Sequence, residues 1–278
     1  MQPLKADLHC HTTFSDGTLT VEQLLQVANE RQLHGLSITD HDTIAAYETA
    51  LPLAKTLAIS LISGIEISAE YQKKSIHVLG YAFDLQHPEL RDFCLRLQEN
   101  RAQRNVKILE RLAACKFPIA LEELYEKFGP VNLGRPHIAK IMVAKGYVKT
   151  VRHAFDRYLG DQGRCYVAGF NVEVPEAIAL IQRAGGFAVL AHPHYLKPKK
   201  IVEKVCEFPF DGIEVYYGLL SPAQEQPWLD LAKKKNWFAT GGSDFHGAKK
   251  SFQLGCSWTP EETFAMLAQR FAQHHRIN

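Results

Sequence analysis

Short apolar runs alternate with amphipathic, helix-like segments along this chain of 278 residues. The apolar runs end in Gly or in polar residues, a pattern typical of buried parallel strands. They cover residues 4–11, 33–42, 58–68, 74–83, 186–194, 210–218 and 236–247. The helix-like segments cover about 44–57, 175–184, 199–207, 222–235 and 260–274, and another begins at Thr20, which has capping-box spacing to Gln23. The alternation predicts an α/β fold with a parallel sheet of seven strands.

The pattern becomes wholly helical between the fourth and fifth predicted strands, from Pro88 to about Phe170. One long amphipathic stretch is followed by three shorter segments, each ending at or near a Gly. We therefore expect a small helical domain, residues 88–170, inserted into a larger domain formed by residues 1–87 and 171–278. The length of the chain is close to the ~250 residues of an α/β barrel.

The composition, 46% hydrophobic and 22% charged residues, is that of a packed globular protein and excludes a disordered or fibrous chain. No apolar run approaches the ~20 residues of a membrane span, and the N-terminal stretch shows no apolar core of an export signal. The six cysteines are scattered without a CxxC pair. This usage predicts reduced thiols and a cytoplasmic location.

The net charge is only +2, so the chain as a whole carries no signal for binding polyanions. The charge is unevenly distributed, because residues 88–170 hold 15 basic and 9 acidic residues, a net of +6. The rest of the chain is net acidic. The asymmetry is either ordinary variation between surfaces or the sign of an acidic metal pocket that faces a basic, anion-binding insert.

Histidine, aspartate and glutamate residues stand at or near the end of almost every predicted strand. Alternate residues of a strand face the same side, so His9 and His11 can bind one ion together. In a parallel barrel these strand ends meet at one rim, where catalysis takes place. Imidazole with carboxylate is the ligand set of Zn, Mn or Fe. The candidate metal ligands are His9, His11, Asp16, His41, Glu66, His77, His192, Asp244 and His246, with His194 as either a ligand or a substrate-binding residue.

Three further acidic residues lie beside these candidates. Asp40 and Asp42 are at least as well placed to brace a ligand or cap a helix as to bind metal. Asp7 precedes the His9–His11 pair and is a candidate to brace a ligand.

The motifs DLHCHTTFSDG, TDHD, GIEIS, HVLGY, AHPH and GGSDFHG occur in this order from the first candidate ligand to the last. Together they resemble the PHP (polymerase and histidinol phosphatase) family, whose fold is a distorted (β/α)7 TIM-like barrel. The resemblance implies three divalent metal ions, of which Mn is expected and Fe or Zn are alternatives. By motif, the implied ligands are His9, His11, Asp244 and a bridging Glu66 for the first ion; Glu66, His77 and His192 for the second; and Asp16, His41 and His246 for the third.

The GRPHIA stretch at 134–139 and the helical insert resemble a bacterial subgroup with 3′,5′-nucleotide bisphosphate phosphatases and a 5′→3′ exoribonuclease. The resemblance implies hydrolysis, by a metal-activated water, of the 5′-linked phosphoester of 3′,5′-nucleotide bisphosphates or of 5′-phosphorylated short oligoribonucleotides. Glu66 and Asp244 would act through the metals. His194 is the candidate to protonate the leaving group, although His192 and His194 could exchange roles.

Basic residues of the insert are the candidates for binding a second phosphate. Arg101 and Arg104 lie three apart on one helix face; their alternative role is a solvated surface. Arg135 precedes His137 at a predicted helix start, where backbone N–H groups favour an anion, and arginine suits bidentate phosphate contacts. The predicted partner is a phosphorylated nucleotide or short RNA, with no membrane and no obligate protein partner.

Two other functions stay open at this point. One is a phosphatase for a small molecule such as histidinol phosphate, and the other is a non-catalytic PHP module. The intact set of candidate metal ligands disfavours the non-catalytic module. The sequence does not choose between a mononucleotide and an oligonucleotide.

Overall fold

The computed structural model describes residues 4–129, 131–168, 172–218, 220–247 and 252–274, and within them it contains eight strands in two sheets. The strands are β1 (Ala6–Cys10), β2 (Gly35–Ile38), β3 (Ser60–Ile62), β4 (Gly64–Tyr71), β5 (Lys74–Tyr81), β6 (Phe187–Leu190), β7 (Gly212–Tyr217) and β8 (Phe238–Gly242). The first sheet has the order β1-β2-β3 and the second β4-β5-β6-β7-β8. The α/β class predicted from the alternation of strands and helices is confirmed.

The two sheets contact each other along both edges. Cys10, at the end of β1, forms a parallel bridge with Phe245 after β8, and the His11 N–H donates to the Phe245 carbonyl at 2.8 Å. On the other edge, His41 after β2 forms a parallel bridge with Glu66 in β4. The residues that follow β1, β2 and β8 are thereby brought together with β4.

The prediction of seven parallel strands is wrong in one region. The predicted strand 58–68 is two strands, β3 and β4, and β4 pairs antiparallel with β5, which also pairs antiparallel with β6. The hairpin turn uses Gln72 and Lys73, both at positive φ (49° and 63°). Such turns usually carry Asn or Gly, so Gln72 and Lys73 gave no turn signal. A continuous apolar run also does not show whether a strand is parallel or antiparallel to its neighbour.

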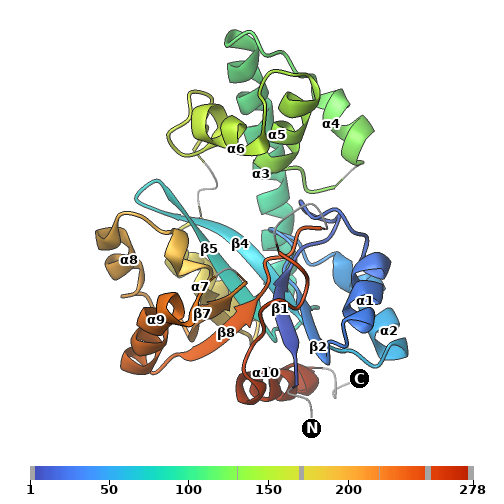
Figure 1. Cartoon of the computed structure of the whole chain (residues 1–278), viewed down its shortest axis with the longest axis vertical. Coiled ribbons are helices and arrows are strands. Elements are labelled where there is room, and N and C mark those ends of the chain that lie inside the picture. Colours follow the sequence, from blue (N-terminus) through green and yellow to red (C-terminus); the bar gives the residue numbers. More distant parts are fainter. Residues whose placement is uncertain (1–3, 130, 169–171, 219, 248–251, 275–278) are drawn as a thin grey trace.

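The predicted helices are present around the sheets. They are α1 (Val21–Glu30), α2 (Ala46–Thr56), α7 (Val174–Arg183), α8 (Lys199–Val205), α9 (Pro222–Lys235) and α10 (Glu261–His274). The capping box at the start of α1 is confirmed, because the Gln23 N–H donates to the Thr20 hydroxyl and the Thr20 N–H to the Gln23 side chain. Helices α1 and α2 lie beside β1–β3, and α7–α9 lie beside the second sheet (Figure 1). No helix in the described ranges is long and apolar enough to cross a membrane.

Residues 88–168 form the helical insert at the top of Figure 1, on the side of the sheets toward which β1 runs. Its elements are α3 (Pro88–Ala114), α4 (Leu121–Phe128), α5 (Arg135–Ala144), α6 (Val151–Ala154) and a π-helical turn, Phe155–Leu159. The first turns of α3 bury Leu90 and Phe93 in the main core, whereas a second core of its own begins at Ile108. Helix α3 is therefore shared between the two cores and carries the insert above the ends of the strands.

Tyr47 of α2 ties the first sheet together, and its removal is expected to lower stability. Its buried hydroxyl accepts from the Ile38 N–H (3.0 Å) and donates to the Ile62 carbonyl (2.8 Å). Tyr47→Phe leaves both strand groups without this partner, at a cost of ~1–3 kcal/mol. Thermal denaturation should show a Tm lower by several degrees. The control is Tyr125→Phe, at an exposed position of α4; equal Tm values for the two variants would contradict the prediction.

Candidate active site

Two histidines at the end of β1 face the same buried point. The Nε2 atom of His9 lies 3.5 Å from Glu66 Oε2 and 3.4 Å from Asp244 Oδ1. The Nε2 atom of His11 lies 3.3 Å from each of the same two oxygens. The β-strand period and the bridge between His11 and the residues after β8 thus bring two imidazoles and two carboxylates together, as the sequence predicted.

Glu66 is the centre of this arrangement. Besides His9 and His11, the Nδ1 atom of His41 lies 3.2 Å from Oε2, the Nδ1 atom of His77 lies 2.6 Å from Oε1, and His192 Nε2 lies 3.0 Å from Oε1. Burial by itself raises the pKa of the Glu66 carboxyl, but the surrounding imidazoles, His41 first, hold it well below its usual range. The carboxylate therefore stays ionised.

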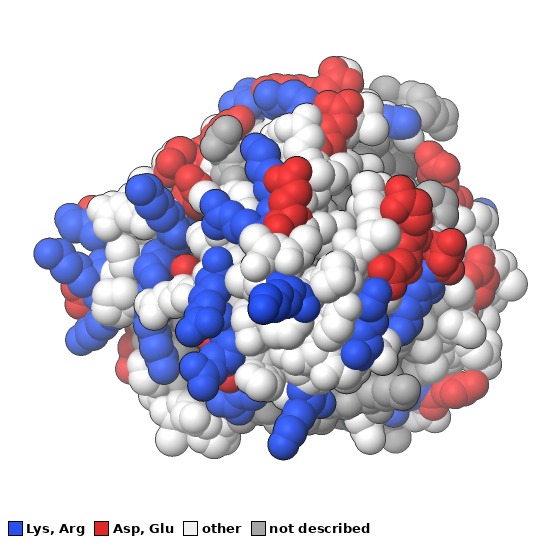
Figure 2. Space-filling view, turned by 90° about the horizontal axis from the view of Figure 1, so that it is seen from above, with Lys and Arg blue, Asp and Glu red and all other residues white. Residues whose placement is uncertain are grey.

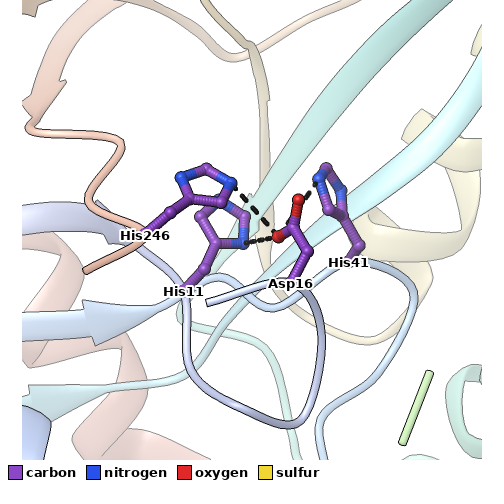
Figure 3. A group of neighbouring side chains, drawn as sticks. All are labelled: His11, Asp16, His41 and His246. Atoms are coloured by element: carbon purple, nitrogen blue, oxygen red, sulfur yellow. Dashed lines mark ion pairs between the residues drawn. The ribbon is translucent and has the colours of Figure 1, made fainter. Parts of the chain in front are cut away.

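A neighbouring group forms around Asp16, in the loop after β1 (Figure 3). Its Oδ1 atom lies 3.1 Å from His246 Nε2, 3.8 Å from His11 Nδ1 and 4.0 Å from His41 Nε2. Burial raises the pKa of the Asp16 carboxyl, and its interactions with the neighbouring imidazoles, His246 first, more than reverse that effect. His11 and His41 each belong to this group and to the group around Glu66, so the two groups are continuous.

The donor atoms fit divalent metal ions. His9 Nε2, His11 Nε2, Asp16 Oδ1 and His41 Nδ1 are buried without a hydrogen-bond partner, although native proteins satisfy nearly all such atoms. Three sets with mutual donor distances within 4.8 Å occur: His11, Asp16, His41 and His246; His9, His11 and Asp244; His41, Glu66 and His77. Burial lowers the pKa of His41 to about 3, so its ring is neutral, the form that binds a metal.

The three acidic residues beside the ligands brace the backbone around them. Asp7 accepts from the His9, Ser243 and Gly255 N–H groups, at 3.2, 2.9 and 2.7 Å. Asp40 accepts from the Thr12 N–H and hydroxyl and from the Ser15 hydroxyl, which orders the loop that carries Asp16.

Asp42 joins the insert to this framework. One of its carboxylate oxygens accepts from the Ser68 N–H at 2.7 Å, and the other pairs with the Arg101 guanidinium. Burial raises the pKa of Asp42, and the charge of Arg101 more than reverses that effect. For Asp7, Asp40 and Asp42, the contacts therefore support the bracing role that the sequence analysis considered.

Glu214 is a part of the site that the sequence analysis missed. This fully buried carboxylate of β7 lies 2.7 Å from His9 Nδ1 and accepts from the His192 N–H at 2.7 Å. It fixes the tautomer and orientation of His9. In the sequence, the signal for Glu214 was that it is a charged residue inside the otherwise apolar run IEVYY. Tyr217, on the same strand, was also missed, and its hydroxyl donates to Asp244 Oδ2 at 2.6 Å.

Three residues of the site have a strained backbone conformation. His192 has φ 25°, Asp244 φ 50° and Asp42 φ 56°, all in a region that non-glycine residues rarely adopt. Such strain persists where surrounding contacts over-determine the conformation, and it is typical of functional sites. Here the strain turns the residues after β2, β6 and β8 toward the common centre.

His194 lies at the edge of this centre. Its ring packs on Tyr195 and Tyr217, with centroids 4.2 and 4.5 Å away, and its Nδ1 atom is buried without a hydrogen-bond partner. Burial lowers its pKa to about 4. Through Tyr217, which contacts Asp244, the ring is linked to the candidate metal ligands.

A cavity of about 160 Å³ opens from the metal-ligand cluster into the insert. Its walls include Asp16, His41 and His77 on one side and Arg101, Arg104 and Arg135 on the other. The alternative of a solvated surface is wrong for Arg101 and Arg104, because both side chains are buried. Burial, with the charges of Arg101 and Arg135, lowers the pKa of Arg104 to about 9. Three guanidinium groups thus line one cavity with the candidate metal ligands.

Arg135 and His137 were both predicted to bind the substrate, but the structure gives them different contacts. The Arg135 guanidinium is held 5.9 Å from the Phe155 ring and 5.8 Å from the Tyr166 ring, and it pairs with Asp161 at 3.2 Å. His137 does not line the cavity. Its buried Nδ1 accepts from the Gly134 N–H at 3.0 Å, so the ring caps the start of α5. The contacts of His137 thus support a capping role, and the substrate-binding role predicted for it stays a prediction.

Comparisons with known proteins agree with this geometry. A family model described as the PHP domain matches residues 7–164. The chain is 36% identical to the 5′-3′ exoribonuclease Rnm of Salmonella typhimurium, over 91% of this chain and 89% of that protein. It is 29% identical to the 3′,5′-nucleoside bisphosphate phosphatase of Chromobacterium violaceum, over 86% of each. A solved structure described as a candidate metal-dependent phosphoesterase, from Bifidobacterium adolescentis, matches with a TM-score of 0.86 and 30% identity over 96% of each chain.

The family match spans more than half of the chain, and the similarity to the exoribonuclease spans nine-tenths of it. The family match includes the strand ends and loops that carry His9, His11, Asp16, His41, Glu66 and His77. The chain belongs to the PHP domain family and is a phosphoesterase.

Proposed function

We propose that this chain hydrolyses a phosphoester of a nucleotide or short RNA whose first nucleotide carries phosphates at both its 5′ and 3′ positions. The observation that carries the proposal is the cavity in which three arginines face His41 and His77. One phosphate would lie at the metal centre and the other among the arginines. A substrate with a single phosphate, such as histidinol phosphate, would place no second phosphate against the three arginines of the cavity, so it is the weaker candidate.

Three divalent ions, with Mn the first expectation, are proposed at the three ligand sets implied by the family motifs. The buried donor atoms without partners support this. Ions bound there would lower the pKa of a coordinated water and neutralise the charge on the reacting phosphate. Glu66 would be shared between two ions, because both of its oxygens face imidazoles, whereas Asp244 and Asp16 would each serve one group.

The remaining residues would bind and orient the substrate. The arginines would hold the phosphate that is not cleaved by charge-assisted, bidentate contacts. His194 is the candidate proton donor to the leaving oxygen, and the negative charge of a bound phosphate would raise the low pKa that burial gives it.

Three expectations about the whole chain accompany this proposal. The two sheets, which contact each other along both edges, would form one distorted TIM-like barrel. Residues 88–170 would act as the substrate-binding insert, although the boundary at 170/171 lies outside the described residues. The cytoplasmic location inferred from the cysteines stays a prediction.

The metal content tests the first part of the proposal. Protein purified without chelator should contain more than one equivalent of transition metal per chain when measured by plasma mass spectrometry. Removal by EDTA should abolish hydrolysis, and added Mn should restore it, because the proposed ions would generate the nucleophile by lowering the pKa of a coordinated water. Full activity of a metal-free preparation would contradict the proposal.

Asp244→Asn tests one ligand without changing its size. The loss of charge should reduce kcat/KM by more than the roughly 10- to 100-fold that is typical of residues that only orient a ligand. Metal content should fall with it, while the Tm is kept. Asp230→Asn, at an exposed position of α9, is the control. Normal metal content and turnover in Asp244→Asn would exclude a ligand role.

Arg135→Ala tests the arginine cavity. Loss of a charge-assisted contact to phosphate costs about 2–3 kcal/mol, so kcat/KM for adenosine 3′,5′-bisphosphate should fall roughly 30- to 150-fold. Hydrolysis of p-nitrophenyl phosphate, which has no second phosphate, should change little. The control is Arg152→Ala on α6, where the side chain is exposed. Equal losses on both substrates would show that Arg135 serves the reacting phosphate or the fold.

A further inference from the structure

The chain leaves β6 through the active site and enters an exposed basic segment. His192 and His194 follow β6 directly, and Tyr195, Lys197, Lys199 and Lys200 come within six residues of His194. All four of these side chains are exposed. Nothing in the proposed hydrolysis of a bisphosphate mononucleotide uses them.

Tyr195 is an exposed aromatic ring held in a fixed position. It is 56% exposed, yet its ring contacts His194 and Tyr217, with centroids 4.2 and 5.7 Å away, and its hydroxyl lies 3.3 Å from that of Tyr217. Three contacts on one side leave the rest of the ring open to solvent. A rigid, half-exposed tyrosine beside a catalytic centre is a suitable platform on which a nucleobase can stack.

The lysines extend this surface away from the site. Lys199 is 91% exposed and only weakly paired with Glu203 on its own helix, at 3.9 Å. Figure 2 shows that Lys and Arg side chains crowd the side of the molecule where Figure 1 places α8. The local charge therefore favours an anionic polymer, with Glu203 and Glu207 as the opposing charges on the same segment.

This surface and the arginine cavity adjoin different members of the metal-ligand cluster. His41 and His77 line the arginine cavity, whereas His192 and Tyr195 do not. The ring of His192 lies 5.2 Å from that of His77 and 5.6 Å from that of Tyr195. Ring contacts through His77 and His192 thus connect the arginine cavity to Tyr195.

We propose that Tyr195, Lys197, Lys199 and Lys200, here called the downstream surface, bind the RNA strand beyond the phosphate at the metal centre. The inference rests on the proposed function. The 5′-terminal phosphate of the RNA would lie among the arginines, so the strand has to continue from the metal centre in another direction. The downstream surface adjoins the metal centre through His192. Tyr195 stacks on the next base, and the lysines contact the phosphates that follow.

The experiment compares two substrates, adenosine 3′,5′-bisphosphate and a 5′-phosphorylated ten-nucleotide RNA, with a variant that carries Lys197→Ala, Lys199→Ala and Lys200→Ala. For the RNA, KM should rise, and the slope of log KM against log salt should become shallower by about two, since each phosphate contact contributes ~0.7 for single strands. Values for the mononucleotide should be unchanged. Tyr195→Leu should raise the RNA KM roughly 5- to 150-fold, whereas Tyr195→Phe should keep it.

The matched control replaces Lys233, Lys234 and Lys235 by Ala. These three lysines end α9 just before the amino end of β8, away from the carboxyl end that bears Asp244. An unchanged RNA KM and salt slope in the Lys197/Lys199/Lys200 variant would overturn the inference, as would equal losses on both substrates. If the unsubstituted enzyme hydrolyses the bisphosphate but not the RNA, the inference about the downstream surface is overturned and the proposed function is left intact. Hydrolysis of neither substrate would instead reject the proposed function.

Discussion

The buried carboxylate of Glu66 is the group on which the rest of the site depends. Five imidazole rings lie within 3.5 Å of its two oxygens, and they come from residues that follow β1, β2 and β6 or lie within β1 and β5. Removing so many polar groups from water costs free energy unless each finds a partner. The divalent cations proposed here would supply such partners, and metal binding would then be coupled to the stability of this end of the fold.

The insert is tied to the same cluster by contacts to its backbone. The Asn132 side chain donates to the His41 carbonyl at 2.6 Å, and Arg101 pairs with Asp42, the residue after His41. Gly134, at the start of α5, leaves room for Arg101, because a Cβ there would lie 2.8 Å from the guanidinium. The position of the arginine cavity is therefore set by the loop that carries a candidate metal ligand, and substrate binding and catalysis share one framework.

The sequence predicted the elements, and the residues that cluster at the strand ends, better than the connections between strands. His9 and His11 were placed correctly because the strand period alone fixes their common face. The antiparallel direction of β5 was missed, since the Gln72–Lys73 turn has no characteristic residue, and this direction is what brings His77, near the start of β5, to the site. Glu214 was missed because its partners, His9 and His192, are distant in the sequence, and only the assembled sheet places them side by side.

The two basic surfaces differ in residue type, and the difference has a physical consequence. Arg101 and Arg104 are buried, and Arg135 is held between two aromatic rings, so in the proposed function their planar guanidinium groups would select a phosphate by geometry. The lysines beyond Tyr195 are exposed and flexible, and such side chains attract phosphates without reading bases. Phosphate contacts position a nucleic acid but carry no sequence information, and stacking on a tyrosine tolerates every base. If both proposals hold, such a site would recognise the phosphorylation state of a 5′ end and accept whatever sequence follows it.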